Sequence, residues 1–551
     1  MTVMSKSSLL ALGFVAAAAP AHAALVISSA PSQNVSCGSG VCTGVAGNAV
    51  LNVSTLMSML ASGDVVVNGG KAHVVAVDAQ VFWSSGSKLT LNARDDILID
   101  QSISITGTGG LAMTYGESEG KHITYADDAS IAFWDTGSSL VINSHSYTLV
   151  NDIAGLAAHA NGYVALAKSY DAAGDGTYAH APIAQTNGTL DGLGNTISNF
   201  SVGDATEGAL VGFIGFSGGP VSHLRLTNVN VTGGDYTLVG GLAGMSGNVV
   251  YGDSVSGQVT VGAGDMSREA AAGGMVGVTA ASISKLAGSS AAVAVHGGTG
   301  AWIGGLVGAG SADSSHASGT VTSDGGAGSA AGGLVGHGAA TTSYATGNVS
   351  GAQYDGGLIG YGNRASQVDA SGSVSGPAGA SVGGVMGYLD GSGLSDAFAT
   401  GTVTGGDGAL VGGLVGENNG VIEQTYAEGA VSATGTSSAV GGLIGLNRRQ
   451  VTYSYATGPV SGAAPHRTGG LIGVDSSSEG VAHIYTYWDM TTSHIRNPSR
   501  GAGNIANDPD ITGLTHAQLR AALPNGFSTF SWGRKSSLNG RLPYLLDWPP
   551  H

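Results

Sequence analysis

A glycine-rich motif of six residues recurs from residue 239 onward, and it constrains the fold more than any other feature. The motif reads x-Gly-Gly-Leu-Val-Gly with apolar replacements, and its nine copies occupy residues 239–244, 272–277, 303–308, 331–336, 355–360, 382–387, 411–416, 440–445 and 468–473. A degenerate copy precedes them at 208–215. Their first glycines lie 33, 31, 28, 24, 27, 29, 29 and 28 residues apart. Such periods are typical of solenoids, and they are shorter than the roughly 40–45 residues of a four-stranded propeller blade.

A second recurring segment follows most copies of the hexamer. It reads Ser-Tyr-Ala-Thr-Gly-Asn-Val-Ser at 343–350 and returns at 315–322, 368–375, 397–404, 425–432 and 454–461. No helical period fits between these segments, so each repeat holds two or three short strands separated by Gly, Ser and Asn turns. One such unit cannot bury its apolar face alone, whereas a stack of units can. The sequence therefore predicts an all-β parallel β-helix in which each repeat forms one coil.

The second segment also predicts which positions face inward. A column is here the set of residues at one position of the segment in all its copies. Two columns do not vary in residue type. One is alanine, at Ala317, Ala345, Ala370, Ala399, Ala427 and Ala456, and the other is valine, at Val321, Val349, Val374, Val403, Val431 and Val460. Such uniformity indicates interior packing. The position before the alanine varies: His316, Tyr344, Asp369, Phe398, Tyr426 and Tyr455. Because an inward slot would not accept Asp, we expect this column to face solvent and to be the candidate contact surface.

The rest of the chain divides into segments around the repeats. Residues 24–63 predict an N-terminal segment with a cap helix at 54–61, and residues 64–200 predict early coils with a short helix at 152–160. Paired apolar residues two apart support those coils: Leu89/Leu91, Ile97/Ile99, Ile103/Ile105 and Leu111/Met113. Residues 201–486 are predicted to form the repeat β-helix. Residues 487–551 predict a cap, with a capping box at 515–518 and bulky residues to seal the last coil: Trp532, Tyr544, Leu545 and Trp548.

The first 23 residues have the features of a secretory signal peptide. Lys6 supplies a positive start, an apolar run covers 9–19, and Ala-His-Ala at 21–23 fits a cleavage site. We therefore expect a secreted or outer cell-surface protein that starts near Ala24. Cys37 and Cys42 are the only cysteines, and in an oxidising compartment we expect them to form a local disulfide.

Composition and charge exclude some partners. Lys and Arg total 19 against 36 for Asp and Glu, which gives a net charge of −17. No basic stripe is present, so nucleic acid is not an expected partner. No later run of 18 apolar residues exists, so we expect no membrane span. We also expect no cofactor and no metal site.

The motifs resemble a known family. The nine Gly-Leu-hydrophobic-Gly cores, the lead-in Thr-Leu-Asp-Gly-Leu-Gly-Asn-Thr-Ile-Ser-Asn-Phe at 189–200 and Tyr-Trp-Asp at 487–489 are similar to GLUG-motif repeat proteins over about residues 150–548. Residues 50–115 resemble filamentous-haemagglutinin-type bacterial adhesins. These resemblances imply a right-handed β-helix, a secreted or outer-surface location and a role in attachment, and they carry no catalytic residues. The Asn-Pro-Asn-Gly and Asn-Pro-Asn-Leu motifs of two-partner secretion domains do not occur, which leaves the export route open.

The expected function is a non-enzymatic, adhesin-like structural protein whose partner is a host or environmental surface glycan or protein. Glycan contact through Tyr344, Phe398, Tyr426 and Tyr455 is one hypothesis; the alternative, which we favour, is that these rings stack only to stabilise neighbouring coils. A different function class is a carbohydrate-active β-helix enzyme, a polysaccharide lyase or hydrolase. Such a site needs two or three carboxylates, or a carboxylate with Arg or Lys, on adjacent coils.

The acidic residues of the repeats do not nominate a catalytic pair. Glu417 and Glu423 are the nearest candidates, and solvated faces explain lone acids better. A third possibility is a self-assembling extracellular matrix protein, which would involve self-association.

Overall fold

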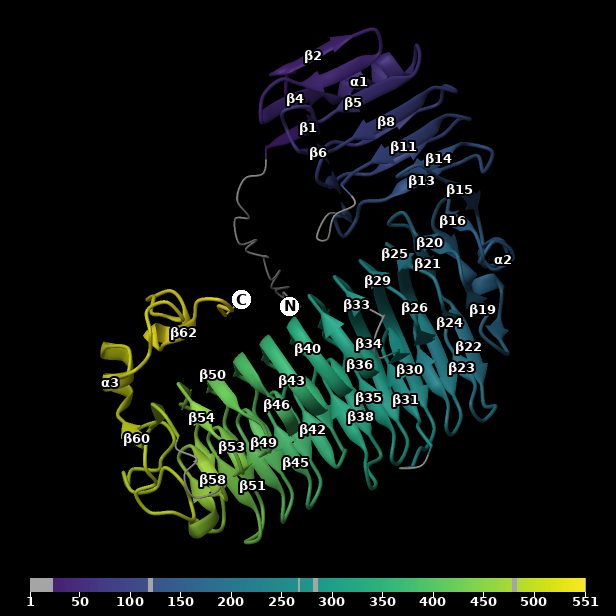
Figure 1. Cartoon of the computed structure of the whole chain (residues 1–551). Helices are drawn as coiled ribbons and strands as arrows, with labels where there is room; N and C mark the ends of the chain where they lie inside the picture. Colours follow the sequence, from purple (N-terminus) through teal and green to yellow (C-terminus); the bar gives the residue numbers. More distant parts are fainter. Residues whose placement is uncertain (1–22, 117–121, 266–267, 281–285, 478–482, 551) are drawn as a thin grey trace, which may run out of the picture.

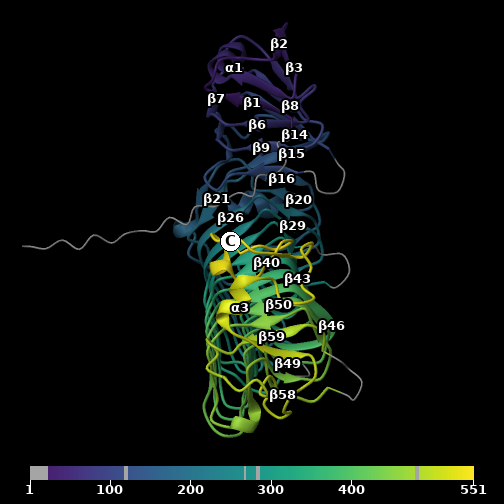
Figure 2. The same ribbon diagram turned by 90° about the vertical axis from the view of Figure 1, so that its left-hand side faces the viewer.

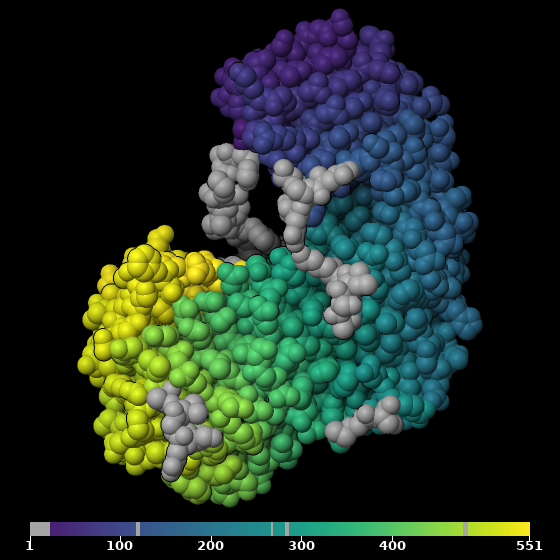
Figure 3. Space-filling view, viewed as in Figure 1, coloured from purple at the N-terminus to yellow at the C-terminus, as the bar shows by residue number. Residues whose placement is uncertain are grey.

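The computed structural model describes residues 23–116, 122–265, 268–280, 286–477 and 483–550. The chain is coiled into about 17 turns of stacked parallel strands with few helices, so the predicted all-β parallel β-helix is confirmed. The stack is curved, with the N-terminal coils at one end and the C-terminal segment at the other (Figures 1 and 3). Residues 1–22 of the predicted signal peptide lie outside the described residues.

The N-terminal coils have three parallel faces. The first face contains β4 (Asn48–Asn52), β1 (Ala24–Ser28), β6 (Val74–Val77), β9 (Ile97–Ile99) and β12 (Ile123–Tyr125). The second contains β3 (Val41–Gly44), β5 (Val65–Asn68), β8 (Lys88–Asn92), β11 (Gly110–Thr114) and β14 (Leu140–Ile142). The third contains β7 (Val81–Trp83), β10 (Ile103–Ile105) and β13 (Ile131–Phe133). The apolar pairs of β8 to β11 are buried, which confirms the predicted early coils.

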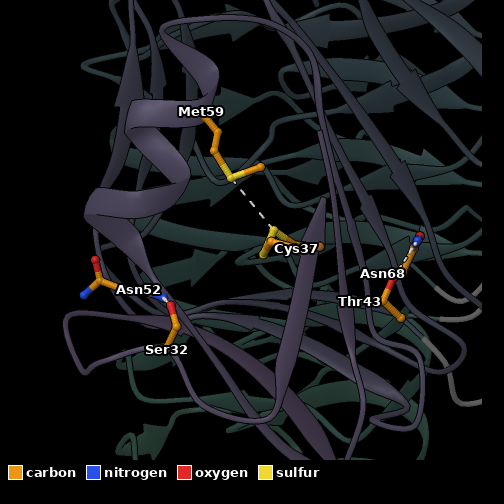
Figure 4. Close-up of a disulfide and its surroundings, with 7 residues drawn as sticks. Ser32, Cys37, Thr43, Asn52, Met59 and Asn68 are labelled. Carbon is orange, nitrogen blue, oxygen red and sulfur yellow. Dashed lines mark hydrogen bonds between the residues drawn. A yellow bond between two sulfur atoms is a disulfide. The ribbon is translucent and has the colours of Figure 1, made fainter. Parts of the chain in front are cut away.

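The N-terminal end of this stack is closed by a hairpin and a helix. β2 (Val35–Gly38) pairs antiparallel with β3 and places Cys37 opposite Cys42, and the two sulfur atoms are bonded. Helix α1 (Val53–Leu60) lies beside β7, the edge strand of the third face. Its Met59 side chain points toward the disulfide (Figure 4), and Met59 Sδ lies 3.9 Å from Cys42 Sγ. The predicted cap helix at 54–61 is therefore confirmed to within one residue.

A typical repeat coil contains four short strands rather than the two or three expected. One coil comprises β48 (Leu410–Gly412), β49 (Val415–Asn418), β50 (Ile422–Ala427) and β51 (Val431–Ala433). The hexamer spans the corner between the first two. Val411 in β48 lies in register with Val382 and Val440 of the neighbouring coils. The first halves of the hexamers thus form one continuous ten-stranded parallel sheet.

The hexamer glycines let opposite walls of a coil approach each other. A β-carbon added to Gly305 would lie 3.0 Å from the β-carbon of Ala317, and one added to Gly304 would lie 2.0 Å from the Val307 carbonyl oxygen. The same 3.0 Å approach recurs in later coils, for Gly333–Ala345, Gly357–Ala370, Gly413–Ala427 and Gly442–Ala456. The hexamer glycines therefore lie opposite the alanine column, across a narrow interior. Both predicted inward columns are buried.

Two further helices and the end of the stack follow the sequence pattern. Asp152 caps α2 (Ile153–Ala158), and the predicted capping box of Thr515 and Gln518 opens α3 (His516–Ala521). In β59 (Thr486–Asp489), Trp488 is fully buried in the interior of the last coils. β60 (Ile511–Leu514) pairs parallel with β59 and completes the stack.

Candidate functional site

The predicted contact column does lie at one position of consecutive coils. Its members follow one another in register from His316 to Tyr455. Ring centroids are 4.8 Å apart for His316–Tyr344, 4.8 Å for Phe398–Tyr426 and 5.2 Å for Tyr426–Tyr455, with nearly parallel planes. The prediction that the column faces solvent is wrong for four members, since Asp369, Phe398, Tyr426 and Tyr455 are buried.

The C-terminal segment covers these four residues. Phe527, Trp532 and Leu545 pack on the stacked rings, and the Tyr455 hydroxyl donates a hydrogen bond of 2.6 Å to the Pro543 carbonyl. Figure 2, which views the molecule from this side, shows the segment lying over the coils. The bulky C-terminal residues thus cover the outside of the stack, whereas Trp488 fills the interior at its end. Of the residues expected to seal the last coil, Trp532, Leu545 and Trp548 pack instead against the outward column, and the expectation for Tyr544 stays a prediction.

This arrangement also explains the single acid in the column. Trp548 Nε1 donates a hydrogen bond of 2.8 Å to Asp369 Oδ1. A carboxylate is accepted at an otherwise aromatic position because the covering segment supplies a donor. Only His316 and Tyr344 stay half-buried, so most of the column is an internal interface rather than a contact surface.

A second aromatic set remains at the surface of four consecutive coils. Trp302 and Tyr354 begin β35 (Trp302–Gly304) and β42 (Tyr354–Gly356), directly before a hexamer. Directly after a hexamer come His337, Tyr361 and Tyr388, in β40 (Val335–Ala345), β43 (Ile359–Ala370) and β46 (Met386–Ala399). All five side chains are half-buried. Each hexamer forms a corner of its coil. The residue before the hexamer of one coil therefore lies near the residue after the hexamer of a neighbouring coil, as Trp302 and His337 do.

These rings line a groove, here called the aromatic groove. Its volume is about 390 Å³, and its lining includes Trp302, His337, Tyr354 and Tyr361. Ring centroids are 4.3 Å apart for Trp302–His337, 5.0 Å for His337–Tyr361 and 5.4 Å for Tyr354–Tyr361. Tyr388 extends the row, stacked on Tyr361 at 5.0 Å. Trp302 Nε1 donates to the Gly328 carbonyl at 3.0 Å, which fixes its ring.

Carboxylates lie in the lining of the aromatic groove and beside its tyrosines. Asp265 contributes to its lining. The Tyr361 hydroxyl donates to Asp390 Oδ2 at 2.8 Å, and Asn419 donates to the other oxygen of Asp390 at 3.2 Å. Glu417, opposite Tyr388 in the next coil, is paired with Arg448. The groove thus combines apolar ring faces with hydrogen-bond acceptors of negative charge.

The electrostatic environment keeps the groove's rings uncharged at neutral pH. Burial and the hydrogen bond to Asp390 raise the pKa of Tyr361, and burial together with Glu417 raises the pKa of Tyr354 and of Tyr388. Burial lowers the pKa of His337. A general base must be unprotonated at the working pH so that it can accept a proton from the substrate. Tyrosines with raised pKa values are poor bases; the Tyr361 hydroxyl donates to Asp390, and the Tyr354 hydroxyl accepts from Gln353 Nε2.

The carboxylates expected as the nearest catalytic pair are not part of one site. Glu417 lies in β49 and Glu423 in β50, on different faces of the coil. Sequence reasoning also missed the aromatic groove, although its signal is present. The residues directly after three consecutive hexamers are His337, Tyr361 and Tyr388, and aligning the positions that flank the motif reveals them.

Comparisons with protein-family models, with curated proteins and with solved structures return no match. Within the described ranges, no helix combines the length and apolar character that crossing a membrane requires.

Proposed function

We propose that the chain is a secreted or cell-surface β-helix protein of the adhesin type, which binds an extracellular glycan in the aromatic groove without catalysing a reaction. The observation that carries this proposal is the row of half-buried rings on four consecutive coils. Sugar rings present apolar C–H faces and hydroxyl edges. Aromatic faces with a few convergent polar groups are suited to both.

The length of the groove supports an oligosaccharide over a single sugar. Four coils separated by ~4.8 Å span about 14 Å along the stack. Rings placed at successive coils offer several stacking positions along one chain of sugars.

The charge around the groove selects the class of glycan. Asp265 and Asp390 present carboxylates, Glu417 is paired with Arg448, and the whole chain carries a net charge of −17. Like charges across an interface disfavour binding. The groove therefore suits neutral sugars or amino sugars, whose hydroxyl or ammonium groups donate to carboxylates. Uronate polymers, the substrates of the alternative lyase function, are disfavoured.

The secreted location is supported by two features. The first 23 residues follow the pattern of a signal peptide. The Cys37–Cys42 disulfide at the N-terminal end of the stack suits an oxidising compartment.

A glycan array tests the proposal. Chain 24–551 should bind neutral or amino-sugar oligosaccharides, and Trp302→Ala and Tyr361→Ala should each weaken binding about tenfold or more, as expected for aromatic anchors. Tyr344→Ala is the matched control, because this ring lies outside the groove, and it should bind as the wild type does. Circular dichroism verifies that each variant is folded.

Two results would contradict the proposal. One is groove variants that bind as tightly as the wild type. The other is release of unsaturated products from uronate polymers, measured by ultraviolet absorbance, which would favour the lyase alternative.

A further inference from the structure

A separate cluster of buried polar side chains lies in the last coils. Asp475 ends β58 (Ile472–Asp475), and His483 and Asp508 belong to the segments that follow. Their exposed fractions are 4%, 2% and 8%. One potential ligand atom from each lies within 4.8 Å of the others. This cluster takes no part in the aromatic groove.

The contacts of Asp475 fix the cluster in place. His483 Nε2 lies 2.8 Å from Asp475 Oδ2. The other carboxylate oxygen accepts hydrogen bonds of 3.0 Å from Asn447 Nδ2 and from the Ser477 amide. Asn504 holds the Asp475 backbone through two further hydrogen bonds, of 2.8 and 2.7 Å. The carboxylate is therefore held in position by its surroundings.

Two atoms of the cluster have no partner among the described residues. They are Asp508 Oδ2 and His483 Nδ1, and both are buried. Buried polar atoms are normally hydrogen-bonded, and buried charges are paired or bind metals. Two adjacent buried carboxylates beside one imidazole are therefore a set of donor atoms that a bound cation would satisfy.

We propose that Asp475, His483 and Asp508 bind one divalent transition-metal cation, and that Zn²⁺ is the ion best suited to them. Zinc accepts imidazole nitrogen together with carboxylate oxygen and is satisfied by a small ligand set. Calcium takes six to eight oxygen ligands, and this cluster offers three residues, one of them a nitrogen donor. The ion links β58 to two segments of irregular backbone and so stabilises the end of the stack.

The sequence does not disclose this site. The intervals between the three residues match no familiar metal motif, and the expectation from sequence was that no metal is bound. The ligands meet only because the segments after β58 return to its end.

Metal analysis of the untagged chain 24–551 tests the proposal. After chelator treatment and dialysis, calorimetric titration with ZnCl₂ should give one ion per chain, with Mn²⁺ weaker and Ca²⁺ weakest. Asp508→Asn and His483→Gln should each reduce Zn²⁺ affinity about tenfold or more. His516→Ala is the control, because His516 contacts a single carboxylate, Asp489, at 2.6 Å, and its Zn²⁺ stoichiometry should stay at one.

A thermal melt gives a second readout that needs no variant. Zn²⁺ should raise the melting temperature of the wild type, because an ion that binds only the folded chain stabilises it. The proposal is overturned if the wild type binds no stoichiometric Zn²⁺, or if it prefers Ca²⁺. Equal Zn²⁺ affinity in folded Asp508→Asn and His483→Gln would overturn it as well.

Discussion

At each hexamer the absence of a β-carbon decides whether the two walls of a coil can meet. A β-carbon on Gly357 would lie 2.0 Å from the Gly384 carbonyl oxygen and 3.0 Å from the Ala370 β-carbon. We expect Gly357→Ala to lower the free energy of unfolding by about 3 kcal/mol, measured by urea denaturation. Gly174→Ala is the matched control, because nothing lies within 4 Å of its added β-carbon. Equal stability of the two variants would contradict this explanation of the motif.

Asp355 is the one acid at the first position of a hexamer. Its neighbours in register are Ala331 and Val382. The side chain is fully buried; Oδ1 accepts a hydrogen bond from the Ala352 amide at 3.0 Å, and Oδ2 has no partner among the described residues. Burial raises the pKa of this carboxyl well above its ordinary value. At a pH where the Asp355 carboxyl is ionised in the unfolded chain, burying it on folding therefore lowers the free energy of unfolding.

Replacing Asp355 should stabilise the protein in a pH-dependent way. The unfolded carboxyl ionises near pH 4, and the folded one ionises only at higher pH, so its cost grows as pH rises through that interval. We expect Asp355→Val to raise the free energy of unfolding by about 1–3 kcal/mol at pH 7 and by less below pH 4. Asp324→Val, at a side chain 55% exposed, should give no such gain in stability. A gain that is the same at both pH values would refute the buried-charge explanation.

At the scale of elements, the strands could be predicted more fully than their surroundings. The early coils and the inward alanine and valine columns follow from local alternation and from repetition, and they are confirmed. The cover over the outward column could not be predicted, since it depends on contacts such as Trp548 with Asp369, 179 residues apart in sequence. From the local sequence, an Asp in a column of aromatic residues predicts that the column is exposed to solvent. Only the distant partner of Asp369, Trp548, shows that the position is buried.

The covering segment gives an element-scale prediction. Trp548→Ala removes the donor to Asp369 and part of the cover over the rings, so we expect the free energy of unfolding to fall by about 1–3 kcal/mol, with increased binding of a hydrophobic dye. Phe530 belongs to the same segment but is 90% exposed, and Phe530→Ala should leave both measurements unchanged. Dye binding and stability that do not differ between these variants would mean that the segment is not docked on the column.

At the scale of the whole molecule, stacking creates sites that no single repeat contains. Trp302 and Tyr388 lie 86 residues apart in the sequence and belong to one row of rings on the stack. The aromatic groove could have been predicted by aligning the residues that flank each hexamer. The Asp475–His483–Asp508 cluster could not, because irregular segments bring it together and no repeat relates its members.

Cysteine cross-linking measures most directly whether consecutive repeats are neighbouring coils in register. Thr404 lies opposite Ser432, and Ser432 lies opposite Ser461 of the next coil. Adjacent coils are ~4.8 Å apart, within the Cα separation of about 4.4–6.8 Å that a disulfide needs, whereas two coils are about 9.6 Å apart and exceed it. After oxidation, mass spectrometry of unreduced digests should find a new disulfide in Thr404→Cys/Ser432→Cys and free thiols in Thr404→Cys/Ser461→Cys. A disulfide in the second variant but not in the first, or equal cross-linking in both, would contradict the stacked-coil register on which the groove depends.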